Sequence, residues 1–189
     1  HDIDTGTTPV EAGLTWAIQK VRRAGGERAG GYPGAGDFET ADPATYATLV
    51  TSTGADVINL IDPGIVRLSG LTISGGAHGI YAEGFPFEDH GLTIENCIVE
   101  DNGDPSVEGG GIYAGVPTVV QSSVVRNNVG DRGAGISGEG DLTVEASLIE
   151  GNVGHGDHGG GIYAYGQLTI EGSVIRNNRI GETAGYGWG

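Results

Sequence analysis

A short segment recurs along this chain at a nearly constant spacing, and this repeat limits the fold more than any other feature. The run from Leu92 to Asn102 has close copies after it and a looser copy before it, and the five copies begin at residues 66, 92, 118, 142 and 168. Successive starts are therefore 26, 26, 24 and 26 residues apart. Each copy alternates apolar and polar residues between Gly and Asn, which is typical of short strands with no room for a helix. One such unit cannot bury its own apolar face, so the units must stack, and the sequence predicts an all-β parallel solenoid of about five coils.

Alternation along each copy predicts which side chains face the core. Leu92 and Ile94 should point inward and Thr93 outward, because successive side chains of a strand lie on opposite faces. Cys97 falls in an inward column of small residues, whose other members are Ser123, Ser147 and Ser173. We therefore expect Cys97 to be a core residue and not a catalytic thiol, which needs an exposed electropositive setting. As the chain has 1 cysteine, an internal disulfide is excluded.

An asparagine ends the repeated segment at the same position in four copies. The four residues are Asn102, Asn128, Asn152 and Asn178. Stacked asparagines can exchange side-chain hydrogen bonds from coil to coil, and buried polar groups require such partners. We interpret the four as a structural ladder, with a binding role as the alternative.

The residues before the repeats predict a cap on the solenoid. Thr8 to Glu11 has the spacing of a helix start, and Trp16 to Ala24 carries apolar residues at helical intervals, so a short N-terminal capping helix is expected. No strand is expected between Gly25 and Pro43. Strands should resume at Ala47 to Thr51 and at Val57 to Ile61. The predicted division is an N-terminal cap over residues 1–55 and β-helix repeats over residues 56–189.

Two further motifs complete the repeat. Glycine-rich turns precede an isoleucine at Gly109 to Ile112 and at Gly159 to Ile162, and an aliphatic residue stands three positions before each ladder asparagine, as in Val99 to Asn102. These segments resemble the repeats of the pectate-lyase-like superfamily. More narrowly, they resemble the GGA(I/L/V) and FxxN repeats of polymorphic outer-membrane proteins and related bacterial cell-surface proteins. The resemblance implies a right-handed parallel β-helix and a place at the cell surface.

Enzymes of that superfamily place calcium-binding aspartates and a basic residue together on one face, and the chain lacks such a set. The outward basic residues of the repeats, Arg126 and Arg176, alternate with Glu100 and Glu150 in one column. Stacked at strand spacing, this order predicts cross-strand ion pairs. We therefore expect a protein without catalytic residues, with a polysaccharide lyase or hydrolase as the alternative.

The most metal-like cluster of the sequence is in one glycine-rich turn. His155, Asp157 and His158 could meet one ion if the turn curls, although such residues also serve solubility. No cofactor is expected. Calcium is the candidate cation, because the 25 acidic against 9 basic residues give a net charge of −16.

Two outward columns are candidate contact surfaces. The first is an aliphatic stripe, and stripes of this kind usually mark contacts on a protein surface. Its members are Ile98, Val124, Leu148 and Val174. The second is a row of tyrosines, interrupted by Ser137, which could stack on sugar rings, contact a partner or simply cover the sheet. Its members are Tyr81, Tyr113 and Tyr163.

Charge and composition narrow the function. The acidic balance repels nucleic acid and anionic membranes, and no apolar stretch is long enough to span a membrane. The sequence has no methionine, which favours a processed, exported form. The function predicted is a non-catalytic extracellular structural or adhesive module, which self-associates into a filament or layer or binds another cell-surface protein. The alternative is a carbohydrate-active or glycan-binding β-helix protein.

Overall fold

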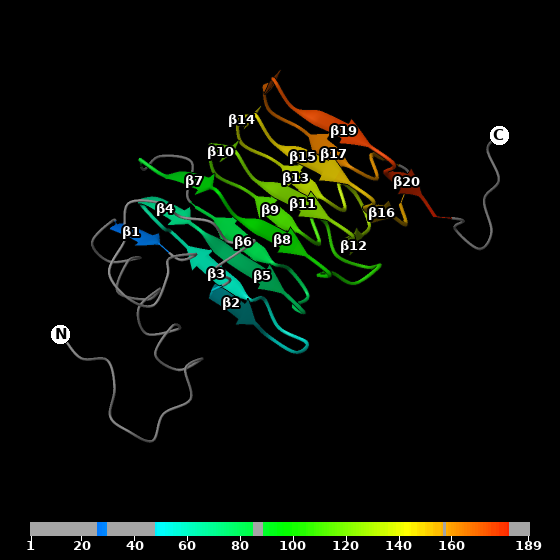
Figure 1. The fold of residues 1–189 in the computed structure, drawn as a ribbon, viewed down its shortest axis with the longest axis horizontal. Coiled ribbons are helices and arrows are strands. Elements are labelled where there is room, and N and C mark those ends of the chain that lie inside the picture. The colour runs from blue at the N-terminus through cyan, green and yellow to red at the C-terminus, as the bar shows by residue number, and fades with distance from the viewer. Residues whose placement is uncertain (1–25, 30–47, 85–88, 157, 182–189) are drawn as a thin grey trace.

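A computed structural model of the protein describes residues 26–29, 48–84, 89–156 and 158–181. These residues form strands β1 to β20, and every pairing between strands is parallel. No helix occurs in the described ranges. Figure 1 shows the strands stacking coil upon coil from the cyan end to the red end. The predicted all-β solenoid of about five coils is confirmed.

Four sheets run along the stack, and each coil contributes one strand to most of them. Sheet 1 consists of β1 (Gly26–Ala29), β4 (Ile65–Ser69), β7 (Gly91–Glu95), β10 (Thr118–Gln121), β14 (Leu142–Glu145) and β18 (Leu168–Glu171). Sheet 2 consists of β2 (Thr48–Thr51), β5 (Leu71–Ser74), β8 (Ile98–Glu100), β11 (Val124–Arg126), β15 (Leu148–Glu150) and β19 (Val174–Arg176). Sheet 3 consists of β3 (Ile58–Ile61), β6 (Ile80–Glu83), β9 (Ile112–Ala114), β13 (Ile136–Gly138) and β17 (Ile162–Ala164). Sheet 4 consists of β12 (Val129–Gly130), β16 (Val153–Gly154) and β20 (Arg179–Ile180).

The register of the sheets follows the repeat. Leu92 pairs with Val66 in the coil before it and with Thr118 in the coil after it, so the starts of successive copies lie side by side. The same holds further along, where Leu142 pairs with Leu168. Equivalent residues therefore form files that run along the solenoid axis.

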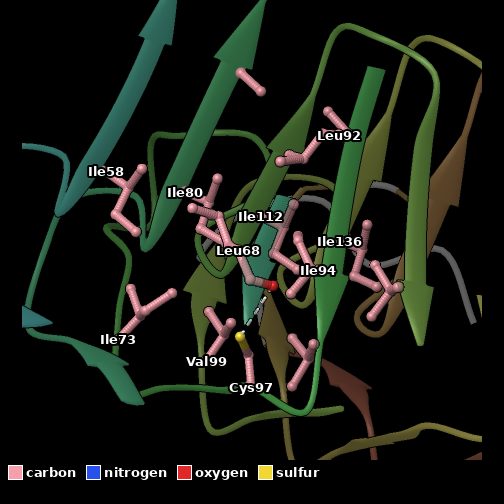
Figure 2. Close-up of a cluster of buried hydrophobic side chains, with 14 of the residues drawn as sticks. Ile58, Leu68, Ile73, Ile80, Leu92, Ile94, Cys97, Val99, Ile112 and Ile136 are labelled. Atoms are coloured by element: carbon pink, nitrogen blue, oxygen red, sulfur yellow. Dashed lines mark hydrogen bonds between the residues drawn. The ribbon is translucent and has the colours of Figure 1, made fainter. Parts of the chain in front are cut away.

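The inward files make one continuous core. Leu92 and Ile94 are buried and Thr93 is partly exposed, as alternation predicted. Figure 2 shows isoleucines of successive sheet 3 strands meeting side chains of sheets 1 and 2. The buried members labelled there include Ile58, Ile80, Ile112, Ile136, Leu68, Ile73, Val99 and Cys97.

Single left-handed residues turn the chain from one sheet to the next. Between sheets 1 and 2 they are Gly70, Asn96, Ser122, Ala146 and Gly172, and directly after the strands of sheet 2 they are Gly75, Asp101, Asn127, Gly151 and Asn177. Gly, Asn and Asp adopt this conformation at little cost, whereas Ser122 and Ala146 do so under strain. The bend at Asn96 also resets the alternation, because Glu95 points outward and Cys97, two residues later, points into the core.

The first described strand corrects one expectation. Strand β1 lies where the sequence indicated no strand, and it pairs with β4 from Gly26↔Val66 to Ala29↔Ser69. Strand β1 has no β-branched or aromatic residue, and these are the residues that favour strands. It is a strand because it pairs with β4, and not because of its own propensity. The capping helix predicted from Thr8 onward lies outside the described residues. Among the described residues, no helix has the length and apolar character needed to cross a membrane.

Candidate functional site

The four ladder asparagines are hydrogen-bonded in a chain. The side-chain amide of Asn102 donates to Oδ1 of Asn128 at 3.1 Å, Asn128 donates to Asn152 at 3.0 Å, and Asn152 donates to Asn178 at 2.9 Å. Each amide also donates to a backbone carbonyl, for example that of Val99 for Asn128 at 3.0 Å. The amide protons of the first three ladder members are therefore used inside the fold, so these side chains have few hydrogen-bond donors left for a ligand.

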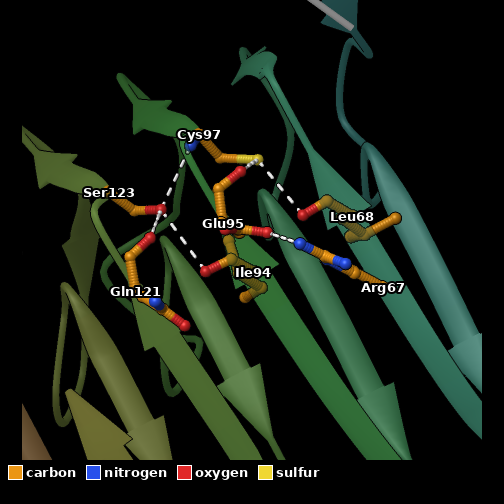
Figure 3. Close-up of polar contacts among 7 residues, drawn as sticks. All are labelled: Arg67, Leu68, Ile94, Glu95, Cys97, Gln121 and Ser123. Carbon is orange, nitrogen blue, oxygen red and sulfur yellow. Dashed lines mark hydrogen bonds and ion pairs between the residues drawn. The ribbon is translucent and has the colours of Figure 1, made fainter. Parts of the chain in front are cut away.

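A second hydrogen-bonded file runs along the bend between sheets 1 and 2 (Figure 3). The backbone N–H of Cys97 donates to Oγ of Ser123 at 3.1 Å, and that of Ser123 donates to Oγ of Ser147 at 3.1 Å. Each serine hydroxyl donates in turn to a carbonyl, as Ser123 does to Gln121 at 2.8 Å. The sequence indicated a column of small residues here but not its hydrogen bonds. Cys97 begins this file, and burial raises the pKa of its thiol to about 11, so it is not a nucleophile at neutral pH.

The aliphatic stripe lies on the outer face of sheet 2. Val124 pairs with Ile98 on one side and Leu148 on the other, and Leu148 pairs with Val174. The first three side chains are half-buried by their neighbours in the file, and Val174 is 51% exposed. Leu49, which is 58% exposed, lies further along the same file, beyond Thr72.

A charged file lies beside the aliphatic stripe on the same face. Arg126 donates through Nε to Glu100 at 2.7 Å, and Arg176 donates to Glu150 at 2.8 Å. Charged residues of opposite sign thus alternate over four strands. Each exposed pair contributes about 0.2–1 kcal/mol to folding, so the file does little for stability.

The tyrosine row lies on the outer face of sheet 3. The rings of Tyr81 and Tyr113 stack, with their centroids 4.8 Å apart and 9° between their planes. The hydroxyl of Tyr81 donates to Glu83 at 2.7 Å, and that of Tyr113 is hydrogen-bonded to Glu139. Burial, together with the adjacent carboxylates, raises the pKa of Tyr81 to about 12 and raises that of Tyr113 as well. Both phenols therefore stay protonated at neutral pH.

An aspartate–histidine pair adjoins this stack. Nδ1 of His78 is 2.7 Å from Oδ1 of Asp56, and Asn59 donates to the other oxygen of Asp56 at 2.7 Å. The ring of His78 packs against Tyr81 with centroids 5.2 Å apart. Although burial alone would raise the pKa of Asp56, the hydrogen bonds from His78 and Asn59 lower it overall. The sequence did not indicate this pair, because a turn of unequal length brings the two residues together.

Ser137 interrupts the tyrosine row in sheet 3. It pairs with Tyr113 on one side and Tyr163 on the other, and its buried hydroxyl has no hydrogen-bond partner in the described part of the chain. The guanidinium of Arg132 lies 5.9 Å from the ring centre of Tyr163, and Glu108 forms an ion pair with Arg132 at 3.3 Å. Tyr163 therefore lies beside a cation and apart from the Tyr81–Tyr113 stack.

The two described histidines of the candidate metal cluster, His155 and His158, lie beside different neighbours. The ring of His158 packs against Tyr163, with centroids 5.6 Å apart. The ring of His155 lies beside Gly181, since a Cβ atom built on this glycine would be 3.5 Å from Nδ1 of His155. Asp157 lies outside the described residues. Among the residues that are described, no three or more His, Cys, Asp or Glu side chains gather as metal ligands would.

Comparison with known proteins agrees with this architecture. A family model described as "Right handed beta helix region" matches residues 56–188. No curated protein and no solved structure gave a match. The match covers the coils that carry the aliphatic stripe, the charged file and the tyrosine row.

Proposed function

Because the chain belongs to the right-handed β-helix family, we propose that it is a non-catalytic structural or adhesive module of the cell surface. In this proposal, the solenoid is a stiff support, and the outer face of sheet 2 is its contact surface. The partner is a second copy of the chain or another surface protein. The resemblance of the repeats to those of bacterial cell-surface proteins and the composition of the chain support the extracellular place.

One observation carries the proposal: the aliphatic stripe keeps its apolar side chains on an outer face. Buried side chains line the inner face of the same strands, so the core does not need Ile98, Val124 or Leu148. Contiguous outward aliphatic residues are typical of surfaces that bind another protein. The charged file beside the stripe supplies the polar margin that such contacts have.

The non-catalytic part of the proposal rests on how the polar side chains are used. Asp56 is hydrogen-bonded to His78, and tyrosine hydroxyls are hydrogen-bonded to Glu83 and Glu139. The charges beside the aliphatic stripe are paired with one another. Catalytic acids and bases must instead face a substrate. Incubation of the protein with a panel of polyuronides and neutral polysaccharides should release no unsaturated or shortened product, and any such product would contradict this part.

The contact surface is tested by Leu148→Lys, which places a charge in the middle of the stripe. The matched control is Thr143→Lys, which adds the same charge to the outer face of sheet 1 in the same coil. Leu148→Lys should abolish adhesion to a surface coated with the wild-type chain, and Thr143→Lys should leave it unchanged. Equal adhesion of both variants, with unfolding curves like the wild type's, would remove sheet 2 as the contact surface.

A second candidate function is glycan binding on sheet 3, favoured by the Tyr81–Tyr113 stack beside the Asp56–His78 pair. Aromatic rings with neighbouring carboxylates and amides are the groups that hold sugars. Titration calorimetry with soluble polysaccharides should then detect binding that Tyr113→Ala removes. Tyr165→Ala is the control, because Tyr165 is 82% exposed and lies outside the row. Absence of heat with every polysaccharide would exclude this candidate.

A further inference from the structure

We propose that the occupant of the sheet 2 face is a second copy of this chain, docked face to face with its solenoid axis reversed. This inference rests on the proposed contact surface and adds the partner and its orientation. It is carried by the order of charges on the four strands β8, β11, β15 and β19, which reads Glu100, Arg126, Glu150, Arg176.

Charge balance favours this face as the one that meets another copy. The chain carries a net charge of −16, so two copies repel each other in most orientations. The outer face of sheet 2 is different: its two outward files carry two glutamates and two arginines, and the other outward residues of its strands are uncharged. The uncharged members are Leu49, Thr51, Ser74, Ile98, Val124, Leu148 and Val174, together with Thr72, which is in the same file but buried. A second acidic copy therefore meets the least repulsion here.

The order of charges is complementary to its own reverse. When the second copy is turned so that its axis runs the opposite way, Glu100 faces the partner's Arg176 and Arg126 faces the partner's Glu150. All four charges then gain an opposite charge across the contact. A shift by one strand would place Arg126 opposite the partner's Arg126 and Glu100 opposite the partner's Glu150. Like charges in contact are unfavourable. The charges thus select one register.

The same rotation also brings the apolar surfaces together. A two-fold axis parallel to the strands, passing between β11 and β15, reverses the solenoid axis but keeps the strand direction. The aliphatic stripe of one copy then lies on the stripe of the other, with Val124 opposite the partner's Leu148. A two-fold axis along the solenoid would instead lay the stripe on the charged file. Only the antiparallel arrangement satisfies both files, and it closes as a dimer.

The size of the face sets the strength of the contact. The four strands of each copy that face each other across this axis, about 4.8 Å apart and about six residues from bend to bend, give roughly 300–400 Å² per copy. This is at the small end for specific contacts, so we expect a reversible dimer with a dissociation constant of about 10 μM to 1 mM.

A charge swap tests the register directly. Arg126→Glu makes two glutamates face each other across the two-fold axis, and Glu150→Arg makes two arginines do so. Each single change should raise the dissociation constant, measured by sedimentation equilibrium, by about tenfold or more. The double variant Arg126→Glu/Glu150→Arg restores opposite charges across the contact and should return the constant to within about threefold of the wild type.

Controls separate the contact from the fold and from net charge. Within one chain, the double variant places its new glutamate beside Glu100 and its new arginine beside Arg176, so recovery of the dimer cannot come from recovered monomer stability. Arg67→Glu changes the charge by the same amount as Arg126→Glu on sheet 1 and should leave the dimer unchanged. Thermal unfolding of each variant checks that it is folded.

The outcomes distinguish the two proposals. A wild-type chain that stays monomeric at about 1 mM, the upper end of the expected range of dissociation constants, or a double variant without recovery, would overturn the antiparallel dimer. If Leu148→Lys still abolishes adhesion to the wild-type chain in that case, sheet 2 remains the contact surface between copies and only the antiparallel orientation is wrong. If Leu148→Lys has no effect on adhesion or on dimerisation, the proposed contact surface itself fails.

Discussion

The side-chain amide of Asn128 donates to Oδ1 of Asn152 at 3.0 Å, and the backbone N–H of Asn128 donates to the same oxygen at 2.9 Å. One oxygen thus fixes both the backbone and the side chain of the coil before it. Asn128 does the same for Asn102. This arrangement holds successive coils in one register at the bend after sheet 2.

Asn128→Ala should therefore be costly. It removes the acceptor for two donors of Asn102 and leaves the buried carbonyl of Val99 without its amide partner. We expect the free energy of unfolding, measured by urea titration, to fall by about 3 kcal/mol. Asn178→Ala, at the partly exposed end of the file, should cost less than about half as much. Equal costs for the two changes would contradict the ladder.

Cys97→Ser should extend the serine file by one coil. The thiol of Cys97 lies 3.2 Å from the carbonyl of Glu95 and 3.6 Å from that of Leu68, the relationships that Ser123 has with Gln121 and Ile94. We expect Cys97→Ser to change the free energy of unfolding by less than about 1 kcal/mol and Cys97→Ala to cost more. Chemical denaturation of both variants measures this. A more stable Cys97→Ala protein would show that the file adds nothing at this position.

Ala146→Gly should stabilise the protein. Ala146 has φ 45°, in the left-handed region where a Cβ is unfavourable, and it is exposed. Glycine removes that strain, so the free energy of unfolding should rise by about 1 kcal/mol. The reciprocal change is Gly172→Ala, with φ 58° and nothing closer than 4.0 Å to the added methyl, and it should cost a similar amount. A loss of stability in Ala146→Gly would argue against the left-handed bend.

The Asp56–His78 pair predicts a dependence of stability on pH. The folded pKa of Asp56 lies below its ordinary value of 3.8, so the ionised carboxylate stabilises the fold above about pH 4, and this contribution is lost as the pH falls through the folded pKa. The difference in unfolding free energy between the wild type and Asp56→Asn should shrink as the pH falls below about 4. His78→Gln, which removes one donor, should weaken this dependence. A difference that grows towards low pH would have the wrong sign.

The stacking of the coils could be predicted from the sequence, because stacking depends only on the period of the repeat and on the alternation of apolar and polar residues. Recurrence of Leu92 and its equivalents set the register, and period two placed Ile94 inside and Thr93 outside. Strand β1 was missed because Gly26–Ala29 has no strand propensity of its own and pairs only because β4 offers a partner edge. The two-residue strands of sheet 4 are too short to show any period.

The side-chain clusters were harder to predict. That Tyr81 and Tyr113 share a file follows from the repeat, but the approach of Asp56 to His78 depends on a turn that differs in length from those of later coils. The bond from Cys97 to Ser123 depends on the left-handed bend at Asn96, which alternation does not reveal. Contacts set by turns, and not by strand period, were therefore outside the reach of the sequence.

The central claim is that equivalent residues of successive coils lie directly beside one another in parallel register. Thr143 and Thr169 are register partners on the outer face of sheet 1, whereas Thr93 and Thr143 are separated by Val119. In a Cys97→Ser background, cysteines at 143 and 169 should form a disulfide under mild oxidation, because neighbouring strands lie about 4.8 Å apart and a disulfide spans about 4.4–6.8 Å between Cα atoms. Cysteines at 93 and 143, two strands apart, should stay reduced. A disulfide between 93 and 143, with none between 143 and 169, would contradict the stacked coils.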